Sequence, residues 1–119
     1  MCLKESKIGV FRNGTWYLDY TGTYATSGTW AGCGAPADPT KAACIAFGIG
    51  SDVPVVGNWN GSADGKSKIG VYRNGMWYLD YPGTYEATGT WAGCGAPTDP
   101  TKDVCAAWGA PGDIPVVTK

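Results

Sequence analysis

The chain has 119 residues, of which 9 are basic, 10 are acidic and none is histidine, and its net charge is −1. This balance lacks the basic surface that nucleic acid and anionic membranes attract, so we expect no nucleic-acid partner. No apolar run approaches the roughly 20 residues that span a bilayer, so we expect no membrane insertion. Without histidine the most common general base and metal ligand is missing, and an enzyme becomes the minority hypothesis.

An internal repeat covers almost the whole chain. Residues 7–58 align without gaps on residues 68–119 at an offset of 61, and 35 of the 52 aligned pairs are identical. A repeat of this length indicates units that bury their apolar faces against neighbouring copies. We therefore divide the chain into an N-terminal extension (1–6), a first repeat with its following turn (7–67) and a second repeat (68–119).

Each repeat opens with a predicted β-hairpin. In the first repeat, β-branched and aromatic residues at 8–12 and 15–20 are separated by Asn13-Gly14, a dipeptide that favours the positive φ angles of a type I′ turn. The copy runs from 69–73 through Asn74-Gly75 to 76–81. The pattern therefore predicts two equivalent hairpins.

Two further strands are predicted after each hairpin. The third lies at 43–47, with its copy near 107–108, and the fourth at 53–56, with its copy at 114–117. Four strands per repeat predict an all-β fold of two four-stranded antiparallel units, which is typical of β-propeller blades. The tryptophans in or beside these strands are interpreted as packing residues: Trp16, Trp59, Trp77 and Trp108.

One ordered series of short motifs points to a family. The series is Phe-Gly at 47–48, Asp-Val-Pro-Val-Val at 52–56, Asn-Trp-Asn-Gly at 58–61 and Ile-Gly-Val-Tyr-Arg at 69–73. It resembles the FG-GAP/VCBS-type repeat of integrin-like bacterial and archaeal surface propellers, and the resemblance covers both repeats. It implies a β-propeller fold and a role in surface binding, adhesion or scaffolding, with no particular ligand.

The order of the strands suggests how copies assemble. Segment 53–56 leads into the second repeat, whereas the first repeat has no such leading strand and 114–117 has no blade to join. Two blades are also fewer than the roughly 4 to 8 of a closed propeller. We expect homo-oligomerisation, head to tail, into a ring of about three or four protomers or into a filament. The residues expected at this junction are Ile8, Val10, Ile114, Val116 and Val117.

Four of the five cysteines recur at equal spacing, which predicts the disulfides Cys33–Cys44 and Cys94–Cys105. A four-thiolate metal site is the alternative, although the short cysteine spacings of zinc ribbons are absent. Disulfides imply an oxidising compartment, either the cell exterior or the periplasm. Cys2 has no counterpart, which leaves three interpretations: an intermolecular bridge, a lone thiol or a residue added to the natural chain.

In related propeller repeats, the turn after the Val-Val strand often carries calcium-binding aspartates. The corresponding stretch here, 58–68, contains the single aspartate Asp64, and Lys68 stands where an acidic ligand is expected. We therefore expect no calcium and no other cofactor.

The long irregular stretches at 21–44 and 82–105 are the candidate ligand-binding regions, because loops of this length are usually functional or disordered. Aromatic rings beside carboxylates can stack on a sugar and accept hydrogen bonds from its hydroxyls. The candidate ligand-binding residues are Tyr24, Trp30, Asp38, Tyr85, Glu86, Trp91 and Asp99. The alternative is that the two tryptophans pack beneath their loops.

Three functions follow from these patterns. The favoured one is a non-enzymatic, extracellular module that assembles by strand complementation and serves as a binding or adhesion scaffold, with other copies of itself and a surface glycan or protein as partners. The second is a purely structural filament subunit or a fragment of a longer surface propeller. The third is a glycoside hydrolase, with Asp19 and Asp80 as its two acids. These acids lie one per repeat, so we predict no catalytic residues.

Overall fold

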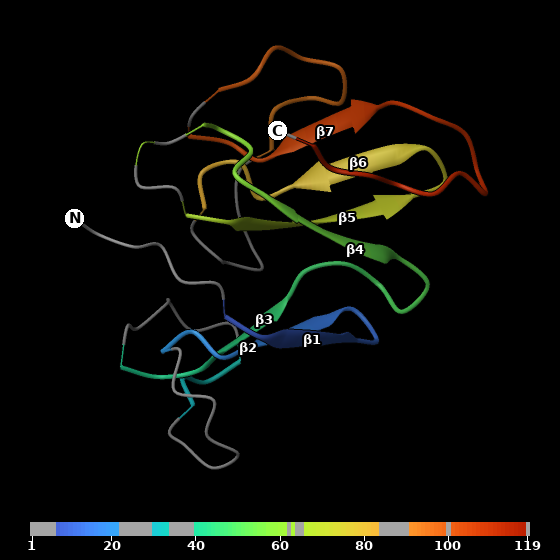
Figure 1. Cartoon of the computed structure of the whole chain (residues 1–119). Coiled ribbons are helices and arrows are strands. Elements are labelled where there is room, and N and C mark those ends of the chain that lie inside the picture. The colour runs from blue at the N-terminus through green and yellow to red at the C-terminus, as the bar shows by residue number, and fades with distance from the viewer. Residues whose placement is uncertain are drawn as a thin grey trace. The chain divides into compact units, whose positions relative to one another are not determined.

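The computed structural model describes residues 7–21, 30–33, 40–61, 63, 66–83, 91–99 and 101–118. These residues form seven β-strands and no helix (Figure 1), and accordingly none of them belongs to a helix long and apolar enough to cross a membrane. They fall into two compact units, the first ending at Gly50 and the second beginning at Ser51. Each unit contains one antiparallel sheet, which confirms the all-β class.

The first unit contains a three-stranded sheet in the order β1-β2-β3. Its strands are β1 (Gly9–Arg12), β2 (Thr15–Leu18) and β3 (Ala43–Ala46). The predicted hairpin is present, and its register pairs Phe11 with Trp16. β2 lies at the centre of the sheet because β3 pairs with its other edge.

The second unit contains a four-stranded sheet in the order β4-β5-β6-β7. Its strands are β4 (Val53–Gly57), β5 (Lys68–Arg73), β6 (Met76–Leu79) and β7 (Val104–Ala107). β4 belongs to the first repeat by sequence, yet it pairs with β5 of the second, with Val53 opposite Tyr72. The second sheet therefore has the leading strand that the sequence pattern predicts for it.

Both hairpin turns have the backbone conformation that their sequence demands. Asn13 and Gly14 have φ angles of 51° and 85°, and Asn74 and Gly75 have 50° and 84°. The positive φ at both central positions is the property of a type I′ turn, so this prediction is confirmed. The glycine is needed for space as well, because a Cβ at Gly14 would lie 2.5 Å from the carbonyl oxygen of Gly48.

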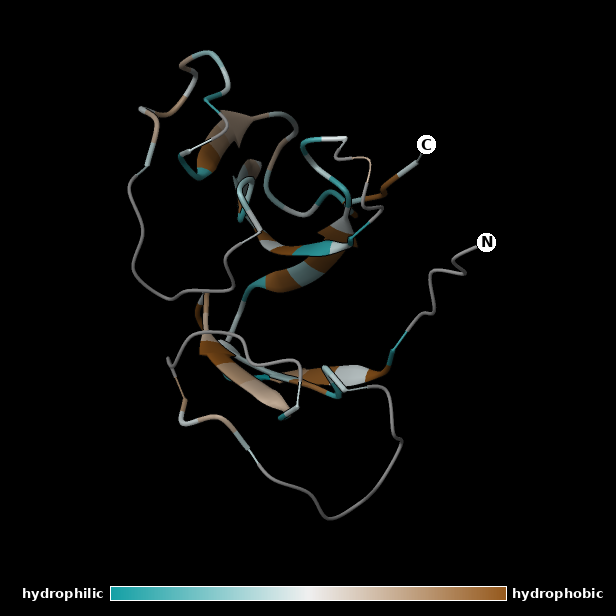
Figure 2. Cartoon of the chain, turned by 90° about the vertical axis from the view of Figure 1, so that its left-hand side faces the viewer, coloured by the Kyte–Doolittle hydropathy of each residue, from teal (hydrophilic) through white to brown (hydrophobic). Residues whose placement is uncertain are grey.

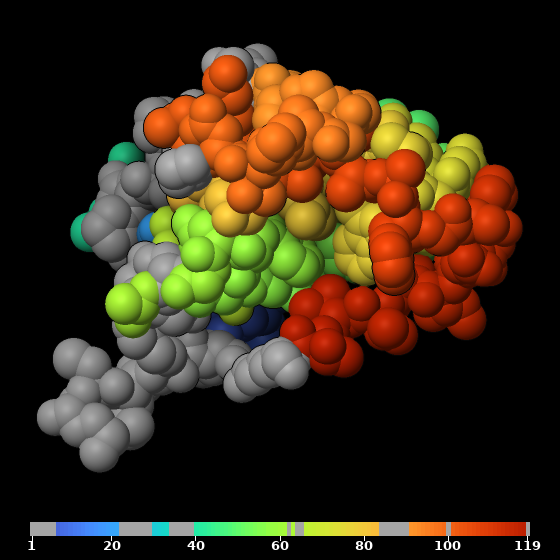
Figure 3. Space-filling model, turned by 90° about the horizontal axis from the view of Figure 1, so that it is seen from above, coloured from blue at the N-terminus to red at the C-terminus, as the bar shows by residue number. Residues whose placement is uncertain are grey.

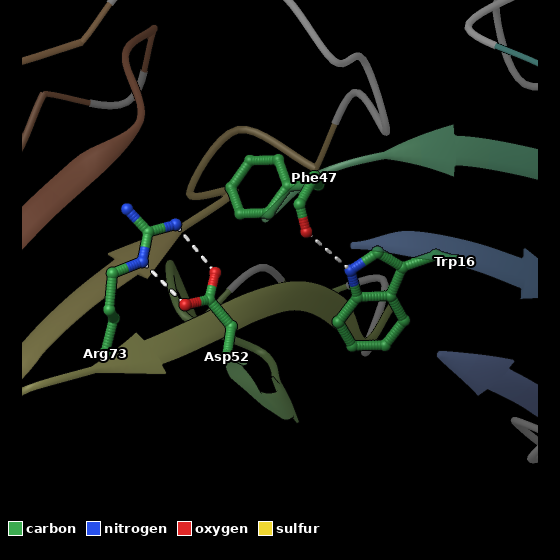
Figure 4. A network of polar contacts seen from close by, with 4 residues as sticks. All are labelled: Trp16, Phe47, Asp52 and Arg73. Carbon is green, nitrogen blue, oxygen red and sulfur yellow. Dashed lines mark hydrogen bonds and ion pairs between the residues drawn. The ribbon is translucent and has the colours of Figure 1, made fainter. Parts of the chain in front are cut away.

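The cores consist of inward-facing strand residues. In the first unit the buried apolar side chains include Trp16, Ile45 and Phe47, and the Trp16 indole donates a hydrogen bond of 3.1 Å to the Phe47 carbonyl (Figure 4). In the second unit β5 is buried on both faces, as expected of a central strand.

The predicted strand at 114–117 is absent, and this prediction is wrong for the chain alone. The segment has no regular structure, and Ile114 is 85% exposed. A strand requires a hydrogen-bonded neighbour, and a sequence that favours an extended backbone does not supply one. Trp108 also departs from its interpretation as a packing residue, because it is 79% exposed.

Candidate functional site

The two repeats place the same sequence in two different environments. In β5, Ile69 and Val71 are 2% and 1% exposed, because β4 covers one edge of the strand and β6 the other. The equivalent residues Ile8 and Val10, in and beside β1, are 61% and 54% exposed. The difference follows the presence of a leading strand, since β1 has β2 as its one strand neighbour in the described sheet.

β1 is therefore a sheet edge that carries apolar side chains. Natural proteins usually protect such edges with charged residues, prolines or bulges, because an unprotected edge pairs readily with another strand. Of the four residues of β1, Arg12 alone is charged, and it lies at the end of the strand. Among the described residues, no strand pairs with the edge of β1 that faces away from β2.

β4 shows how a strand fits beside this sequence. Val55 points into the unit and is 6% exposed, whereas Val53 and Val56 are 43% and 50% exposed. Val55 lies opposite Gly70, where an added Cβ would be 3.2 Å from a Val55 methyl carbon. The absence of a side chain at Gly70 therefore makes room for the valine that the strand inserts.

The segment at 114–117 repeats the sequence of β4 as Ile-Pro-Val-Val. Ile114, Val116 and Val117 are 85%, 74% and 44% exposed. Figure 2 draws this segment as a tube with brown hydrophobic residues beside the C-terminal label, and Figure 3 shows it in red at the molecular surface. It is an exposed apolar segment with the sequence of a strand.

A bidentate ion pair joins β4 to β5, which the sequence analysis missed. The Arg73 Nε and Nη2 atoms donate hydrogen bonds of 2.6 and 2.7 Å to the two carboxylate oxygens of Asp52 (Figure 4). The Asp52 side chain is fully buried. These hydrogen bonds raise the pKa of Arg73 above its ordinary value, against the opposing effect of burial.

The sequence contains a signal for this pair that went unused. Asp52 and Arg73 both recur one repeat away, as Asp113 and Arg12. An acidic residue before one strand and a basic residue at the end of its antiparallel neighbour lie side by side, so they are candidates for a cross-strand ion pair.

The connection between β4 and β5 contains a buried cation. Lys68 is 2% exposed, and its ammonium donates to the Asn58 side-chain oxygen at 2.5 Å and to the Lys66 carbonyl at 2.8 Å. These oxygens are of the kind that a hard metal ion takes as ligands. Asp64 lies outside the described residues, within which no group of three or more acidic or cysteine side chains could hold a metal.

The disulfides Cys33–Cys44 and Cys94–Cys105 are both present, which confirms the predicted pairing. In each, the Cα atoms are 4.4 Å apart and the cysteines are separated by 11 positions. Closing a loop of this length stabilises the fold by about 3 kcal/mol. The bonds indicate an oxidising environment.

Trp30 and Trp91 occupy equivalent places, three residues before the first cysteine of each disulfide. They are 50% and 41% exposed, and each stands edge-on to a tyrosine of the central hairpin strand. The ring centroids are 6.2 Å apart for Trp30 and Tyr17 and 5.9 Å apart for Trp91 and Tyr78. Each indole is thus anchored on one side and open to solvent on the other.

The remaining candidate ligand-binding residues divide into two groups. The Asp99 carboxylate accepts hydrogen bonds from the Thr101 amide and hydroxyl, at 2.8 and 2.7 Å, and these lower the pKa of Asp99. Asp99 is therefore engaged within its own loop. The others lie outside the described residues: Tyr24, Asp38, Tyr85 and Glu86.

Asp19 and Asp80, the acids of the hydrolase hypothesis, serve local structure. The Asp80 carboxylate is 1% exposed and accepts a hydrogen bond of 3.2 Å from the Gly83 amide. Asp19 accepts a hydrogen bond of 3.2 Å from the Thr21 hydroxyl. Both interactions stabilise the turn that follows the second hairpin strand.

Comparisons with protein-family models, with curated proteins and with solved structures find no match to this chain. The resemblance to FG-GAP/VCBS-type repeats therefore stays a prediction from the motifs.

Proposed function

We propose that this protein is a self-assembling, non-enzymatic β-module in which segment 114–117 of one copy adds as a strand to β1 of another. One observation carries the proposal: the Ile-Gly-Val sequence is buried where a Pro-Val-Val strand lies beside it, in β5, and exposed where none does, in β1. The exposed copy of that Pro-Val-Val strand is present in the same chain. Adding a strand to an open sheet edge is a common mode of recognition.

The pairing of β4 with β5 sets the expected register. Val55 faces Gly70 and Val56 faces Ile69, so Val116 is expected opposite Gly9 and Val117 opposite Ile8. Val116 then takes the inward place of Val55, whereas Val117 takes the half-exposed place of Val56. Val116 should therefore contribute most of the burial at the junction.

Each copy would accept a strand at one end and donate one at the other. Such a head-to-tail contact closes into a ring when the rotation per protomer divides a full turn, and otherwise extends into a filament. The ring corresponds to a propeller built from two-blade protomers, as the family resemblance implies. The filament is the structural alternative.

The test is native mass spectrometry under non-reducing conditions, with light scattering at several concentrations. The intact chain should form oligomers, and deletion of 114–119 should leave monomers. Val116→Lys should also abolish assembly, because it places a charge at an inward position. Val117→Lys is the matched control at a half-exposed position and should assemble. A monomeric intact chain, or equal assembly by the deletion variant, overturns the proposal.

A second element of the proposed function is ligand binding at the half-exposed indoles of Trp30 and Trp91. An aromatic ring anchored edge-on to a tyrosine offers a face on which a sugar ring can stack. Assembly would multiply these sites and raise the overall avidity for a surface glycan. A glycan array should give binding that Trp30→Ala and Trp91→Ala together remove. Binding that survives both substitutions overturns this assignment.

The two disulfides favour the cell exterior or cell surface as the place of action, with the periplasm as the other oxidising compartment. A protein that assembles by edge pairing also needs a stable subunit before it meets its partner. The disulfides supply that stability independently of assembly, because each closes its loop within one repeat.

A further inference from the structure

We infer that Arg12 and Asp113 form an ion pair between copies, which fixes the register of the added strand and selects the partner. This inference rests on the proposed strand complementation and names the residues that make it specific. It starts from the ion pair that the second unit already contains.

In the second unit, Asp52 lies directly before β4 and Arg73 ends β5. The register pairs Val53 with Tyr72, so the next step along the ladder places Asp52 beside Arg73. Their two hydrogen bonds, 2.6 and 2.7 Å long, form the fork that a guanidinium and a carboxylate make when aligned in one plane. A shift of the strand by one residue would separate these groups.

Arg12 presents its guanidinium as Arg73 does. Its central carbon lies 5.3 Å from the centre of the Tyr17 ring, and the equivalent distance from Arg73 to Tyr78 is 4.9 Å. Within the described part of the chain, no ion pair to Arg12 is found. The tyrosine therefore holds the cation at the end of β1 before any partner arrives.

Asp113 stands directly before segment 114–117, as Asp52 stands before β4. A short turn holds it in place: its amide donates to the Ala110 carbonyl at 3.1 Å, and its carboxylate accepts from the Ala110 amide at 2.8 Å. The carboxylate is exposed and keeps one oxygen that no described hydrogen bond occupies. Both halves of the ion pair are thus oriented in the single chain.

Specificity follows from what the pair excludes. Asp52 is fully buried in the equivalent junction, so a strand that slipped in register would bury a carboxylate without its guanidinium. An unrelated strand that added to β1 would leave the Arg12 guanidinium without a carboxylate partner. The ion pair therefore penalises wrong partners more than it strengthens the right one.

A charge-swap experiment tests the inference. The variants Asp113→Arg and Arg12→Asp each place like charges at the junction with their own kind, and each should associate at least about 30-fold more weakly than the unmodified chain in sedimentation equilibrium. Mixed together, the two variants offer opposite charges at every junction between unlike copies. The mixture should regain association to within about 10-fold of the unmodified chain.

Lys102→Asp is the matched control, because it changes the charge as Arg12→Asp does but lies outside the strands and segment 114–117. It should associate within about 3-fold of the unmodified chain. If a reversed variant loses its far-ultraviolet circular dichroism, Arg12→Gln and Asp113→Asn replace the pair, and each should weaken association by about 10-fold or more.

The outcomes separate this inference from the proposed function. An unmodified chain that stays monomeric overturns strand complementation and the ion pair together. An unmodified chain that assembles, with reversed variants that assemble equally well alone, overturns the ion pair alone. Weak association of each variant with recovery in the mixture supports both.

Discussion

Truncating Val10 and Val71 to alanine compares one side chain in two environments. The two valines occupy equivalent positions in the repeats, but Val10 is 54% exposed and Val71 is 1% exposed. Burying a valine completely is worth about 2 kcal/mol. Val71→Ala should therefore lower the free energy of unfolding of the second unit by about 2 kcal/mol.

Val10→Ala should lower both the free energy of unfolding and the free energy of association. About half of the Val10 side chain is already buried in the single chain, so the monomer should lose about 1 kcal/mol of stability. If assembly gives Val10 the environment of Val71, the other ~1 kcal/mol appears as association that is about 5-fold weaker. Val71→Ala should leave association unchanged, because Val71 is buried within one chain.

The assay has two parts. Urea unfolding, followed by tryptophan fluorescence at a concentration where the chain is monomeric, gives the folding cost of each variant. Sedimentation equilibrium gives the association constant. Equal unfolding costs for the two variants, together with unchanged association of Val10→Ala, would refute the reasoning that β1 is an incomplete copy of β5.

Three of the remaining predictions concern the second unit and the disulfides. Reducing both disulfides should lower the stability by about 3 kcal/mol for each loop opened, measured by thermal unfolding with and without reductant. Asp52→Asn should cost about 2 kcal/mol in urea unfolding, because it leaves the Arg73 guanidinium without its carboxylate. The Asp99 carboxyl should titrate below the ordinary value of 3.8, so its contribution to stability is present above that value and is lost as the pH falls through its folded pKa. In Thr101→Val the pKa of the Asp99 carboxyl should rise, because the hydroxyl donor is lost, and carbon NMR would measure this change. A final prediction concerns hydrogen exchange, in which amides of β1 should become protected as concentration rises while those of β5 are protected throughout.

The parts of the fold that local chemistry determines could be predicted from the sequence. Asn13-Gly14 and Asn74-Gly75 readily adopt the positive φ angles that a type I′ turn requires, so the hairpins could be predicted from these dipeptides and their flanking β-branched and aromatic residues. The disulfide pairing followed from equal spacing in two copies of one repeat. In both cases the signal lies in a few neighbouring residues or in a spacing that the repeat duplicates.

The parts that depend on long-range neighbours could not be predicted in the same way. The Ile-Pro-Val-Val segment has the composition of a strand, yet it is irregular here, whereas Val-Pro-Val-Val at 53–56 forms β4. Trp108, which the sequence pattern predicts as a packing residue, is 79% exposed. Composition indicates which residues favour burial or an extended backbone. Whether such a residue is buried or forms a strand depends on a neighbouring strand or surface that local composition does not specify.

The candidate site shows the same division. The sequence pattern predicts Ile8, Val10 and Val116 as junction residues by their place in the repeat, but it does not distinguish inward from outward positions. The burial of Val55 relative to Val56 supplies that distinction, and the Asp52–Arg73 pair adds a charge requirement that apolar periodicity does not contain. A repeated sequence therefore allows one completed junction to act as the template for an incomplete one. With the register of β4 on β5 as the template, each residue of segment 114–117 has one expected facing residue in or beside β1.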